Sequence, residues 1–205
     1  MNPVQGPRIP EVSVFVLAGG RSARMGGDKA LLRLQGKTLL ERALALARQI
    51  SPRVAILGPR ERYTATEERV IEDVFTNCGP LAGIHAALQA SETDLNLILS
   101  VDMPFVPFDF LSYLLERAEC RPAALVVAPR VGGIVQGTCC ACRRAFHTVC
   151  EQRLRLGLYK VEDAMQATRA EFIEEEEIRS RGFEAAIFKN LNTPADLTAA
   201  QQRKL

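Results

Sequence analysis

The sequence predicts a three-layer α/β fold with a mostly parallel central sheet. Two observations support this. A short apolar, β-rich run opens the pattern, and similar short runs then alternate with segments of helical periodicity. Such alternation is typical of parallel sheets that helices cover on both faces. In sheets of this kind, ligands bind beyond the carboxyl ends of the strands.

The first half of the chain predicts a β–loop–α–β unit that is then repeated. Val12–Leu17 is a short apolar run that stops at a glycine pair, as buried parallel strands often do. Thr38–Ile50 has leucines and alanines at helical spacing, and the following Ser-Pro ends that helix before a strand over Arg53–Leu57. The alternation continues with a strand at Val70–Ile71, a helix at Leu81–Ala90 and a strand at Leu95–Val101.

The second half predicts the same elements with weaker signals. Short apolar runs indicate strands, and polar segments with helical spacing indicate helices. The expected elements are a helix at Asp109–Ala118, strands at Ala124–Ala128 and Ile134–Ala141, helices at Arg143–Leu156 and Val161–Ala167, and a short strand at Ile187–Asn190. Thr193 and Pro194 have the residue types that favour the N-cap and first turn of a final helix.

Length and composition predict one folded domain. The chain has 205 residues, of which 47% are hydrophobic and 24% charged, close to the averages of folded domains. Residues 1–11 contain three prolines and no periodicity, so we expect a flexible leader there and a single domain over residues 12–205. The sequence shows no internal repeat and no linker.

The charge and hydropathy patterns exclude several classes of protein. With 26 basic and 24 acidic residues, the chain has no overall field that would attract nucleic acid. Its apolar runs are far shorter than the ~20 residues that span a bilayer. The start of the chain has no basic region followed by a cleavable apolar stretch, which predicts a reducing, cytoplasmic location.

Four of the six cysteines lie close together in the sequence: Cys139, Cys140, Cys142 and Cys150. Cys139 and Cys142 have the spacing of metal ligands. However, Cys139 and Cys140 fall within an expected strand, where neighbouring side chains point to opposite faces, and no second pair has suitable spacing. We therefore expect small buried hydrophobic residues.

The histidines and the acidic run receive structural interpretations. His85 and His147 lie on different expected helices, and neither is near a candidate nucleophile. The run Glu174–Glu177 predicts a solvated turn or the start of a helix.

The segment Leu17–Lys29 (LAGGRSARMGGDK) predicts a polyphosphate site. It follows the first strand and contains four glycines, two arginines and one lysine. Glycines let backbone N–H groups approach phosphate oxygens, while Arg24 and Lys29 supply positive charge. The spacing does not fit G-x-G-x-x-G, and a P-loop ending in Gly36-Lys37-Thr38 would need glycine in place of Leu31. The alternative is a glycine-rich surface turn.

This segment resembles the pattern L-A-G-G-x-S-x-R-M-G-x-D-K of the MobA-like nucleotidyltransferases, the molybdenum-cofactor guanylyltransferase family. Four further motifs match in the family's order, so that the resemblance spans nearly the whole chain. They are VIED at Val70–Asp73, GPLAG at Gly79–Gly83, DMP at Asp102–Pro104 and NLNTPADL at Asn190–Leu197. The resemblance implies a Rossmann-like nucleotidyltransferase fold.

The resemblance also implies roles for individual residues. Lys29 and Arg24 would bind the phosphates and, with Asp102, carry catalysis. Asp102 would bind Mg²⁺, which agrees with its position at the end of the strand Leu95–Val101, because a hard cation prefers carboxylates together with nucleotide phosphates. The implied nucleotide-binding residues are Leu17, Ala18, Gly19, Gly20, Lys29, Asp73, Gly79, Gly83 and Asp102.

Asn190 and Asn192 are further candidates for activity. They alternate along an expected extended segment, so only one of them would face Mg²⁺ or the phosphates. The alternative for both is a plain turn or helix-capping role.

The implied activity is transfer of GMP from GTP to molybdopterin (Mo-MPT), which forms Mo-MGD and releases pyrophosphate. Molybdopterin-inserting proteins or molybdoenzyme chaperones are the implied protein partners. The sequence departs from the family at Leu57–Arg60, where the family often has a segment that touches guanine, and at Gly137, where it usually has proline.

Two alternatives therefore remain. One is a cytidylyltransferase, or a sugar or small-phosphate nucleotidyltransferase, of the same fold. The other is a nucleotide-binding protein without turnover. The GPLAG motif favours the guanylyl branch, while Lys29, Arg24 and Asp102 together favour turnover.

Overall fold

The structure is a computed structural model that describes residues 11–19 and 28–202. The strands of its central sheet are β1 (Val12–Leu17), β4 (Val54–Leu57), β5 (Arg69–Ile71), β6 (Leu95–Ser100), β7 (Val126–Val131), β8 (Ile134–Val135), β9 (Cys139–Arg143) and β10 (Ala170–Glu174). The α-helices are α1 (Leu39–Ile50), α2 (Pro80–Ala90), α3 (Phe108–Glu119), α4 (Phe146–Arg155), α5 (Val161–Gln166), α6 (Glu175–Ser180) and α7 (Pro194–Gln201). A separate hairpin pairs β2 (Arg33–Leu34) with β3 (Lys37–Thr38).

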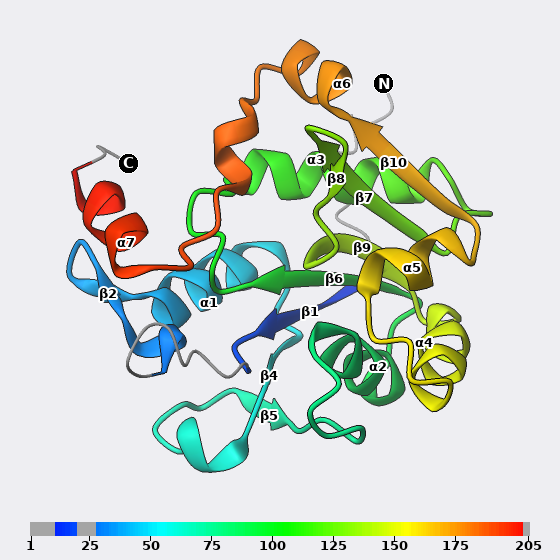
Figure 1. The fold of residues 1–205 in the computed structure, drawn as a ribbon, viewed down its shortest axis with the longest axis horizontal. Coiled ribbons are helices and arrows are strands. Elements are labelled where there is room, and N and C mark those ends of the chain that lie inside the picture. Colours follow the sequence, from blue (N-terminus) through cyan, green and yellow to red (C-terminus); the bar gives the residue numbers. More distant parts are fainter. Residues whose placement is uncertain (1–10, 20–27, 203–205) are drawn as a thin grey trace, which may run out of the picture.

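The sheet is mostly parallel, as predicted. Its strand order is β10-β7-β9-β6-β1-β4-β5, with β8 paired to β7 (Figure 1). Strand β1 runs parallel to β4 and β6, β5 runs parallel to β4, and β10 runs parallel to β7. The exceptions are β9, which is antiparallel to β6 and β7, and β8. The carboxyl ends of β1, β4, β5 and β6 therefore share one edge of the sheet.

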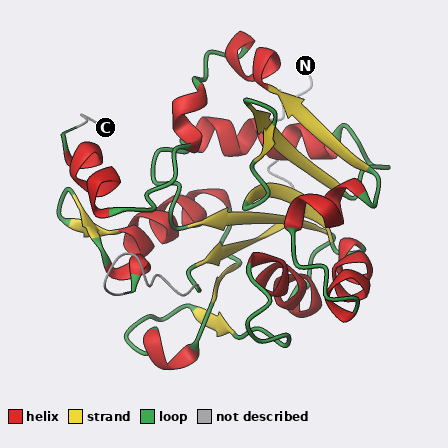
Figure 2. Cartoon of the chain, in the orientation of Figure 1, coloured by secondary structure: helices red, strands yellow, loops and turns green. Residues whose placement is uncertain are grey.

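Helices cover both faces of the sheet, which confirms the three-layer prediction (Figure 2). Alternate residues of β1 divide between two hydrophobic clusters. Val14 and Val16 pack in the cluster of α1 and α3, whereas Phe15 and Leu17 pack in the cluster of α2 and α4. A strand buried on both faces needs a continuous apolar sequence, and VSVFVL comes close to one.

Capping residues position two helices, and the cap of α7 is the one that the sequence predicts. At α1, the Glu41 backbone N–H donates to Thr38 Oγ1 at 3.0 Å, and the Thr38 N–H donates to the Glu41 carboxylate at 2.6 Å. At α7, Thr193 is the N-cap and Pro194 the first residue, with a second capping box to Asp196. Both arrangements satisfy backbone N–H groups that the helix itself leaves unpaired.

Several boundaries in the second half differ from the prediction, and β7 covers Val126–Val131 rather than Ala124–Ala128. The expected strand Ile134–Ala141 divides into β8 and β9, because residues 136–138 form a turn in which the Cys139 N–H donates to the Gln136 carbonyl at 2.9 Å. The expected helix Arg143–Leu156 begins later, because Arg143 still belongs to β9.

The prediction of a strand at Ile187–Asn190 is wrong. A 3₁₀ turn, η4 (Ala185–Phe188), stands there, and the Phe188 ring packs edge-on against Phe110 at 5.0 Å between ring centroids. Tertiary packing rather than strand pairing therefore holds this apolar run. Edge strand β10 was not predicted, while the acidic run does begin a helix, α6.

The clustered cysteines are buried hydrophobic residues, as expected. Cys139 packs on the α1/α3 face of the sheet, and Cys140, Cys142 and Cys150 pack on the α2/α4 face. Burial raises the pKa of the Cys139 and Cys150 thiols, which favours the protonated form that does not bind metals. Of the helices within residues 11–19 and 28–202, none combines the length and apolarity that a bilayer requires.

Thr38→Ala should lower the free energy of unfolding by about 1 kcal/mol, because it removes the side-chain oxygen that caps α1. Thr38→Ser keeps that oxygen and should leave stability nearly unchanged. Urea denaturation followed by circular dichroism measures both variants. Equal stability of the alanine variant and the parent would contradict the capping role.

Candidate nucleotide-binding site

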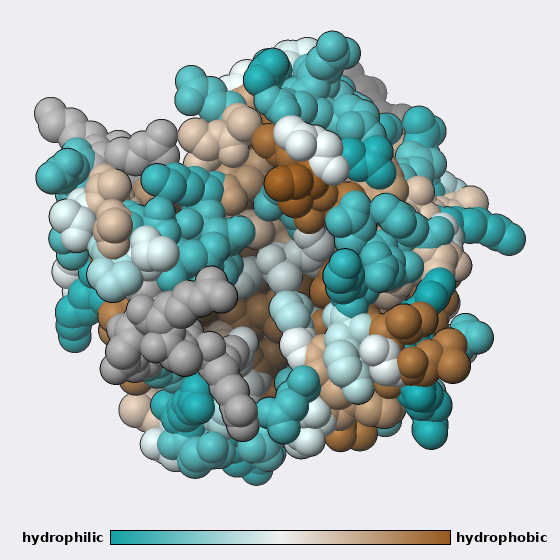
Figure 3. Space-filling view, viewed as in Figure 1, coloured by the Kyte–Doolittle hydropathy of each residue, from teal (hydrophilic) through white to brown (hydrophobic). Residues whose placement is uncertain are grey.

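The backbone just beyond β1 is held by hydrogen bonds to neighbouring segments. The N–H groups of Ala18 and Gly19 both donate to the Leu57 carbonyl, at 3.0 and 2.9 Å, and the Val101 N–H donates to the Leu17 carbonyl at 3.1 Å. A Cβ on Gly19 would lie 3.1 Å from the Gly58 Cα, so glycine permits this close approach of the two chains. The face seen in Figure 3 is hollowed over β1 and β6.

The structure brings three predicted site residues together near this edge. Lys29 Nζ donates to Asp102 Oδ2 at 3.0 Å and to Asn192 Oδ1 at 2.8 Å. The side chains of Lys29 and Asp102 are only 14% and 23% exposed. Because these residues are far apart in the sequence, only tertiary folding assembles this cluster.

Two oxygens on the segments that carry Asp102 and Asn192 lack hydrogen-bond partners among the described residues. Asp102 Oδ1 and Asn190 Oδ1 are buried, and neither has a partner among the described residues. The Leu191 N–H donates to the Asp102 carbonyl at 2.9 Å, which joins the two segments that carry these oxygens. Buried polar atoms normally have a partner, so the two oxygens are consistent with a missing ligand such as a hard cation.

Asn190 and Asn192 are therefore placed differently from each other. Asn192 contacts Lys29, whereas Asn190 leaves its side-chain oxygen unpaired among the described residues. The predicted alternation of the two side chains along an extended strand does not explain this difference, because residues 190–192 are not part of a strand.

Tyr63 lies between the two ends of the predicted phosphate loop, a role that was not predicted. Its hydroxyl donates to the Ala18 carbonyl at 2.9 Å and lies 3.3 Å from Asp28 Oδ2. The other Asp28 oxygen accepts from the Ala30 N–H at 3.0 Å and caps a 3₁₀ turn, η2 (Lys29–Leu31). Burial raises the pKa of Tyr63, so the hydroxyl stays a donor. No local pattern in the sequence links residue 63 to this loop.

Asp73, Gly79 and Gly83 lie along the start of α2. A Cβ on Gly83 would lie 2.7 Å from Leu17 Cδ2 and 3.5 Å from Asp73 Oδ1. The predicted residues Leu17, Asp73 and Gly83 are therefore neighbours. Gly79 is the N-cap of α2 with a φ of 70°, which favours glycine. Desolvation by the surrounding protein raises the pKa of Asp73.

Two predicted residues, Gly20 and Arg24, lie outside the described residues. The segment at Leu57–Arg60 is tied to the neighbouring strand, because the Gly58 N–H donates to the Ile71 carbonyl at 3.0 Å. The Arg60 N–H donates to the Glu72 carboxylate at 3.1 Å. Glu72 therefore has a structural contact.

Comparison with known proteins identifies the family of this chain. Residues 14–177 match the family described as the MobA-like NTP transferase domain. The chain belongs to this family. The resemblance inferred from the sequence motifs is thereby confirmed.

Individual members of the family and of the fold are similar over most of their length. A probable molybdenum cofactor guanylyltransferase of Pelotomaculum thermopropionicum is 33% identical over 187 residues, covering 91% of this chain and 90% of that protein. The molybdopterin-guanine dinucleotide biosynthesis protein A of Archaeoglobus fulgidus superposes with a TM-score of 0.81 at 25% identity, covering 93% and 97% of the two chains. The 2-C-methyl-D-erythritol 4-phosphate cytidylyltransferase of Thermus thermophilus shares the fold, with a TM-score of 0.69 at 24% identity and coverage of 94% and 98%.

Tyr63→Phe should lower the free energy of unfolding by about 1–3 kcal/mol, because it removes the hydroxyl that satisfies the Ala18 carbonyl. Tyr159→Phe is a control at an exposed tyrosine and should change stability by less than about 0.5 kcal/mol. Urea denaturation of the two variants measures the difference. Equal effects would show that Tyr63 does not hold the ends of the loop.

Proposed function

We propose that this chain is a guanylyltransferase that moves GMP from GTP to molybdopterin and releases pyrophosphate. The observation that carries the proposal is the Lys29–Asp102–Asn192 cluster beside the carboxyl edge of the sheet. It joins the positive charge of Lys29 to the Asp102 carboxylate, one oxygen of which has no partner among the described residues. The names of the two similar proteins from Pelotomaculum and Archaeoglobus support guanine nucleotide and molybdopterin as the substrates.

The proposed reaction needs no protein nucleophile. A terminal phosphate oxygen of molybdopterin attacks the α-phosphorus of GTP, the new O–P bond forms, and the bond between the α-phosphorus and the bridging oxygen breaks. Pyrophosphate leaves with that oxygen. Because a phosphate monoester is largely ionised near neutral pH, its second pKa being about 6, no general base is required. Alignment and charge neutralisation supply the catalysis.

Lys29 would neutralise charge on the phosphates. Its two hydrogen bonds hold the ammonium group in place before substrate arrives, so little reorganisation is needed when negative charge develops. Arg24 would add a second positive charge, and the backbone from Leu17 to Gly20 would face the nucleotide. The N–H groups of Ala18 and Gly19 are already bonded to Leu57, so other donors would hold the phosphates.

Asp102 and Asn190 would hold Mg²⁺. Their unpaired oxygens are the donor type that this ion prefers, and Mg²⁺ is usually bound by one or two carboxylates together with substrate phosphates. When bound, the ion would neutralise charge on the α-phosphate and the departing pyrophosphate. Asp73, Gly79 and Gly83 would contact the nucleoside side of GTP, since they surround the start of α2.

The same activity implies a location and protein partners. Free thiols at Cys139, Cys140, Cys142 and Cys150 suit a reducing cytoplasm. Transfer of the finished cofactor to a molybdopterin-inserting protein or a molybdoenzyme chaperone would follow.

A second candidate is a cytidylyltransferase of the same fold. It is favoured by one observation: Leu57-Gly58-Pro59-Arg60 stands where the family often has a segment that touches guanine. The backbone N–H groups of Gly58 and Arg60 are bonded to Ile71 and Glu72, so they do not serve as donors to a base. Likeness to the Thermus enzyme shows only the shared fold.

Asp102→Ala should abolish nucleotidyl transfer while the protein stays folded, because the proposed Mg²⁺ ligand is lost. Lys29→Ala should lower the rate at least about a hundredfold, as loss of a donor to developing negative charge does in other enzymes. Asp109→Ala removes an exposed carboxylate in the first turn of α3 and serves as control. Pyrophosphate release with GTP and molybdopterin measures the rates. Near-normal turnover of Asp102→Ala would contradict the metal assignment.

Titration with the four nucleoside triphosphates in the presence of Mg²⁺ should show preferential binding of GTP. Isothermal calorimetry on the full chain measures each affinity. Tight binding of CTP with no response to GTP would favour the cytidylyltransferase. Binding of GTP without pyrophosphate release from any molybdopterin acceptor would favour a protein without turnover.

A further inference from the structure

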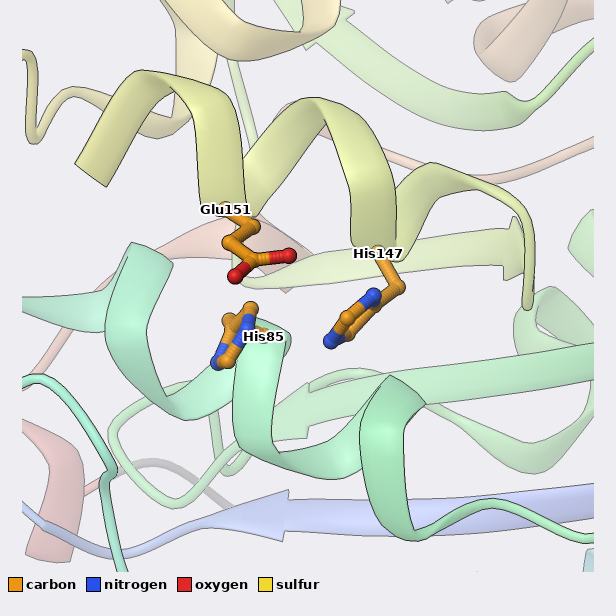
Figure 4. Close-up of side chains that lie close together, drawn as sticks. All are labelled: His85, His147 and Glu151. Carbon is orange, nitrogen blue, oxygen red and sulfur yellow. The ribbon is translucent and has the colours of Figure 1, made fainter. Parts of the chain in front are cut away.

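The two histidines meet where α2 packs against α4. The imidazole of His85 on α2 stacks on that of His147 on α4, with ring centroids 4.4 Å apart and an interplanar angle of 27°. Glu151 lies one turn beyond His147 on the same face of α4, and Figure 4 shows its carboxylate beside the two rings. One nitrogen of each imidazole and one carboxylate oxygen all lie within 4.8 Å of one another. The sequence predicts these histidines on different helices, and the packing of α2 on α4 brings them together.

Both imidazoles have an unsatisfied buried nitrogen. His85 is 2% exposed, and neither its Nδ1 nor the Nε2 of His147 has a hydrogen-bond partner among the described residues. A buried polar atom without a partner costs free energy, so two of them in one contact are unusual. A ligand shared by the two rings would satisfy both nitrogens.

The surroundings of His85 favour its neutral imidazole. Phe75 packs edge-on against His85 at 5.1 Å between centroids, and burial lowers the pKa of His85. Arg155 and the stacked His147 also act against protonation of His85, whereas Glu151 acts in favour of it. A neutral imidazole has the free lone pair that binds a metal ion.

Glu151 is oriented toward the histidines by a neighbouring residue. The Arg155 guanidinium donates to Glu151 Oε1 at 3.1 and 2.7 Å. Both contacts use the same oxygen, so Oε2 is available for another ligand. An outer residue that orients a carboxylate in this way is usual around metal sites.

We propose that His85, His147 and Glu151 bind a first-row divalent cation, with Zn²⁺ as the preferred ion. Two imidazole nitrogens and one carboxylate oxygen are a known zinc-binding set, with a fourth position for water, whereas Mg²⁺ prefers oxygen donors alone. Ligand atoms around tetrahedral zinc lie about 3.4 Å apart, so side-chain atoms within 4.8 Å of one another must close in by up to about 1.4 Å. Because the lone pair of an imidazole nitrogen lies in the plane of its ring, the two stacked rings must also turn toward a common point. His147 and Glu151 are only partly buried, which leaves them room to do so.

This site is separate from the proposed Mg²⁺ site but lies on a helix that reaches the nucleotide site. His85 and Gly83 are two positions apart on α2 and point about 200° apart around its axis. Gly83 packs against Leu17, the last residue of β1, whereas His85 faces α4. A bound ion would link α2 to α4 and thereby stiffen the support of Gly79 and Gly83.

Zinc binding to the full chain tests the proposal. After removal of metal with a chelator, competition with a chromophoric zinc indicator should show one tight equivalent in the parent protein. His147→Ala should weaken binding at least about a hundredfold and Glu151→Gln at least about tenfold, since even outer-residue changes at metal sites cost 10–100-fold. Thr148→Ala, on the same helix but outside the cluster, is the matched control and should bind as the parent does.

Further measurements identify the ligands and separate the two metal sites. Co²⁺ in place of Zn²⁺ should give visible bands without a thiolate charge-transfer band, which excludes the cysteines as ligands. Asp102→Asn should keep zinc affinity, which separates this site from the Mg²⁺ site.

Zn²⁺ should also raise the melting temperature of the parent but not of His147→Ala. Because His85 is buried and its variants are at risk of misfolding, the test uses His147 and Glu151 variants, and circular dichroism confirms that they are folded.

The proposal is overturned if the parent binds no equivalent of Zn²⁺ at micromolar concentrations, or if both variants bind as tightly as the parent. A thiolate band with Co²⁺ would also overturn it. Stacking of the two histidines would then be only a helix–helix contact. None of these measurements depends on nucleotidyl transfer, so they stand apart from the proposed function.

Discussion

The parallel pairing of β1 with β4 and β6 is the constraint on which the rest of the molecule depends. It buries both faces of β1, so that Val14 and Val16 hold α1 and α3 while Phe15 and Leu17 hold α2 and α4. It also brings the carboxyl ends of three strands to one edge. The Leu57 carbonyl, which accepts from both Ala18 and Gly19, shows how tightly the chain is held where β1 ends.

That edge allows distant segments to form one cluster. Lys29, Asp102 and Asn192 come from the turn after the glycine-rich loop, the end of β6 and the segment before α7. The Leu191 N–H bond to the Asp102 carbonyl holds the last two together. A partly buried Lys–Asp contact is weak evidence for stability, because desolvation offsets much of the attraction. In the proposed reaction, its role is to keep a cation and a carboxylate oriented for a phosphate-bearing ligand.

Four of the seven buried side-chain atoms without partners among the described residues lie at two places, and their donor chemistry differs. Asp102 and Asn190 offer oxygens, the ligands of Mg²⁺, whereas His85 and His147 offer imidazole nitrogens, which suit Zn²⁺. Helix α2 extends between the two regions, with Gly79 and Gly83 near one and His85 at the other. Under the two proposals, a cation would hold this helix at one place while the helix supports a nucleotide at the other.

Local sequence determined much of this protein. Apolar runs and caps predicted β1, α1 and α7, because strand burial and N-capping depend on adjacent residues. The motifs, by their resemblance to a family, indicated Lys29 and Asp102. Short apolar runs predicted secondary structure less well. The run Ile187–Asn190 was predicted as a strand, but Phe188 packs on Phe110 in a 3₁₀ turn instead of pairing in the sheet.

Tertiary structure alone decided which distant residues meet. Tyr63 reaches Ala18 across 45 positions, and Lys29 reaches Asn192 across 163. His85 stacks on His147 only because α2 and α4 lie side by side on one face of the sheet. The physical reason is that periodicity and capping act over a few residues, whereas these contacts depend on strand order and helix packing, which no short segment encodes.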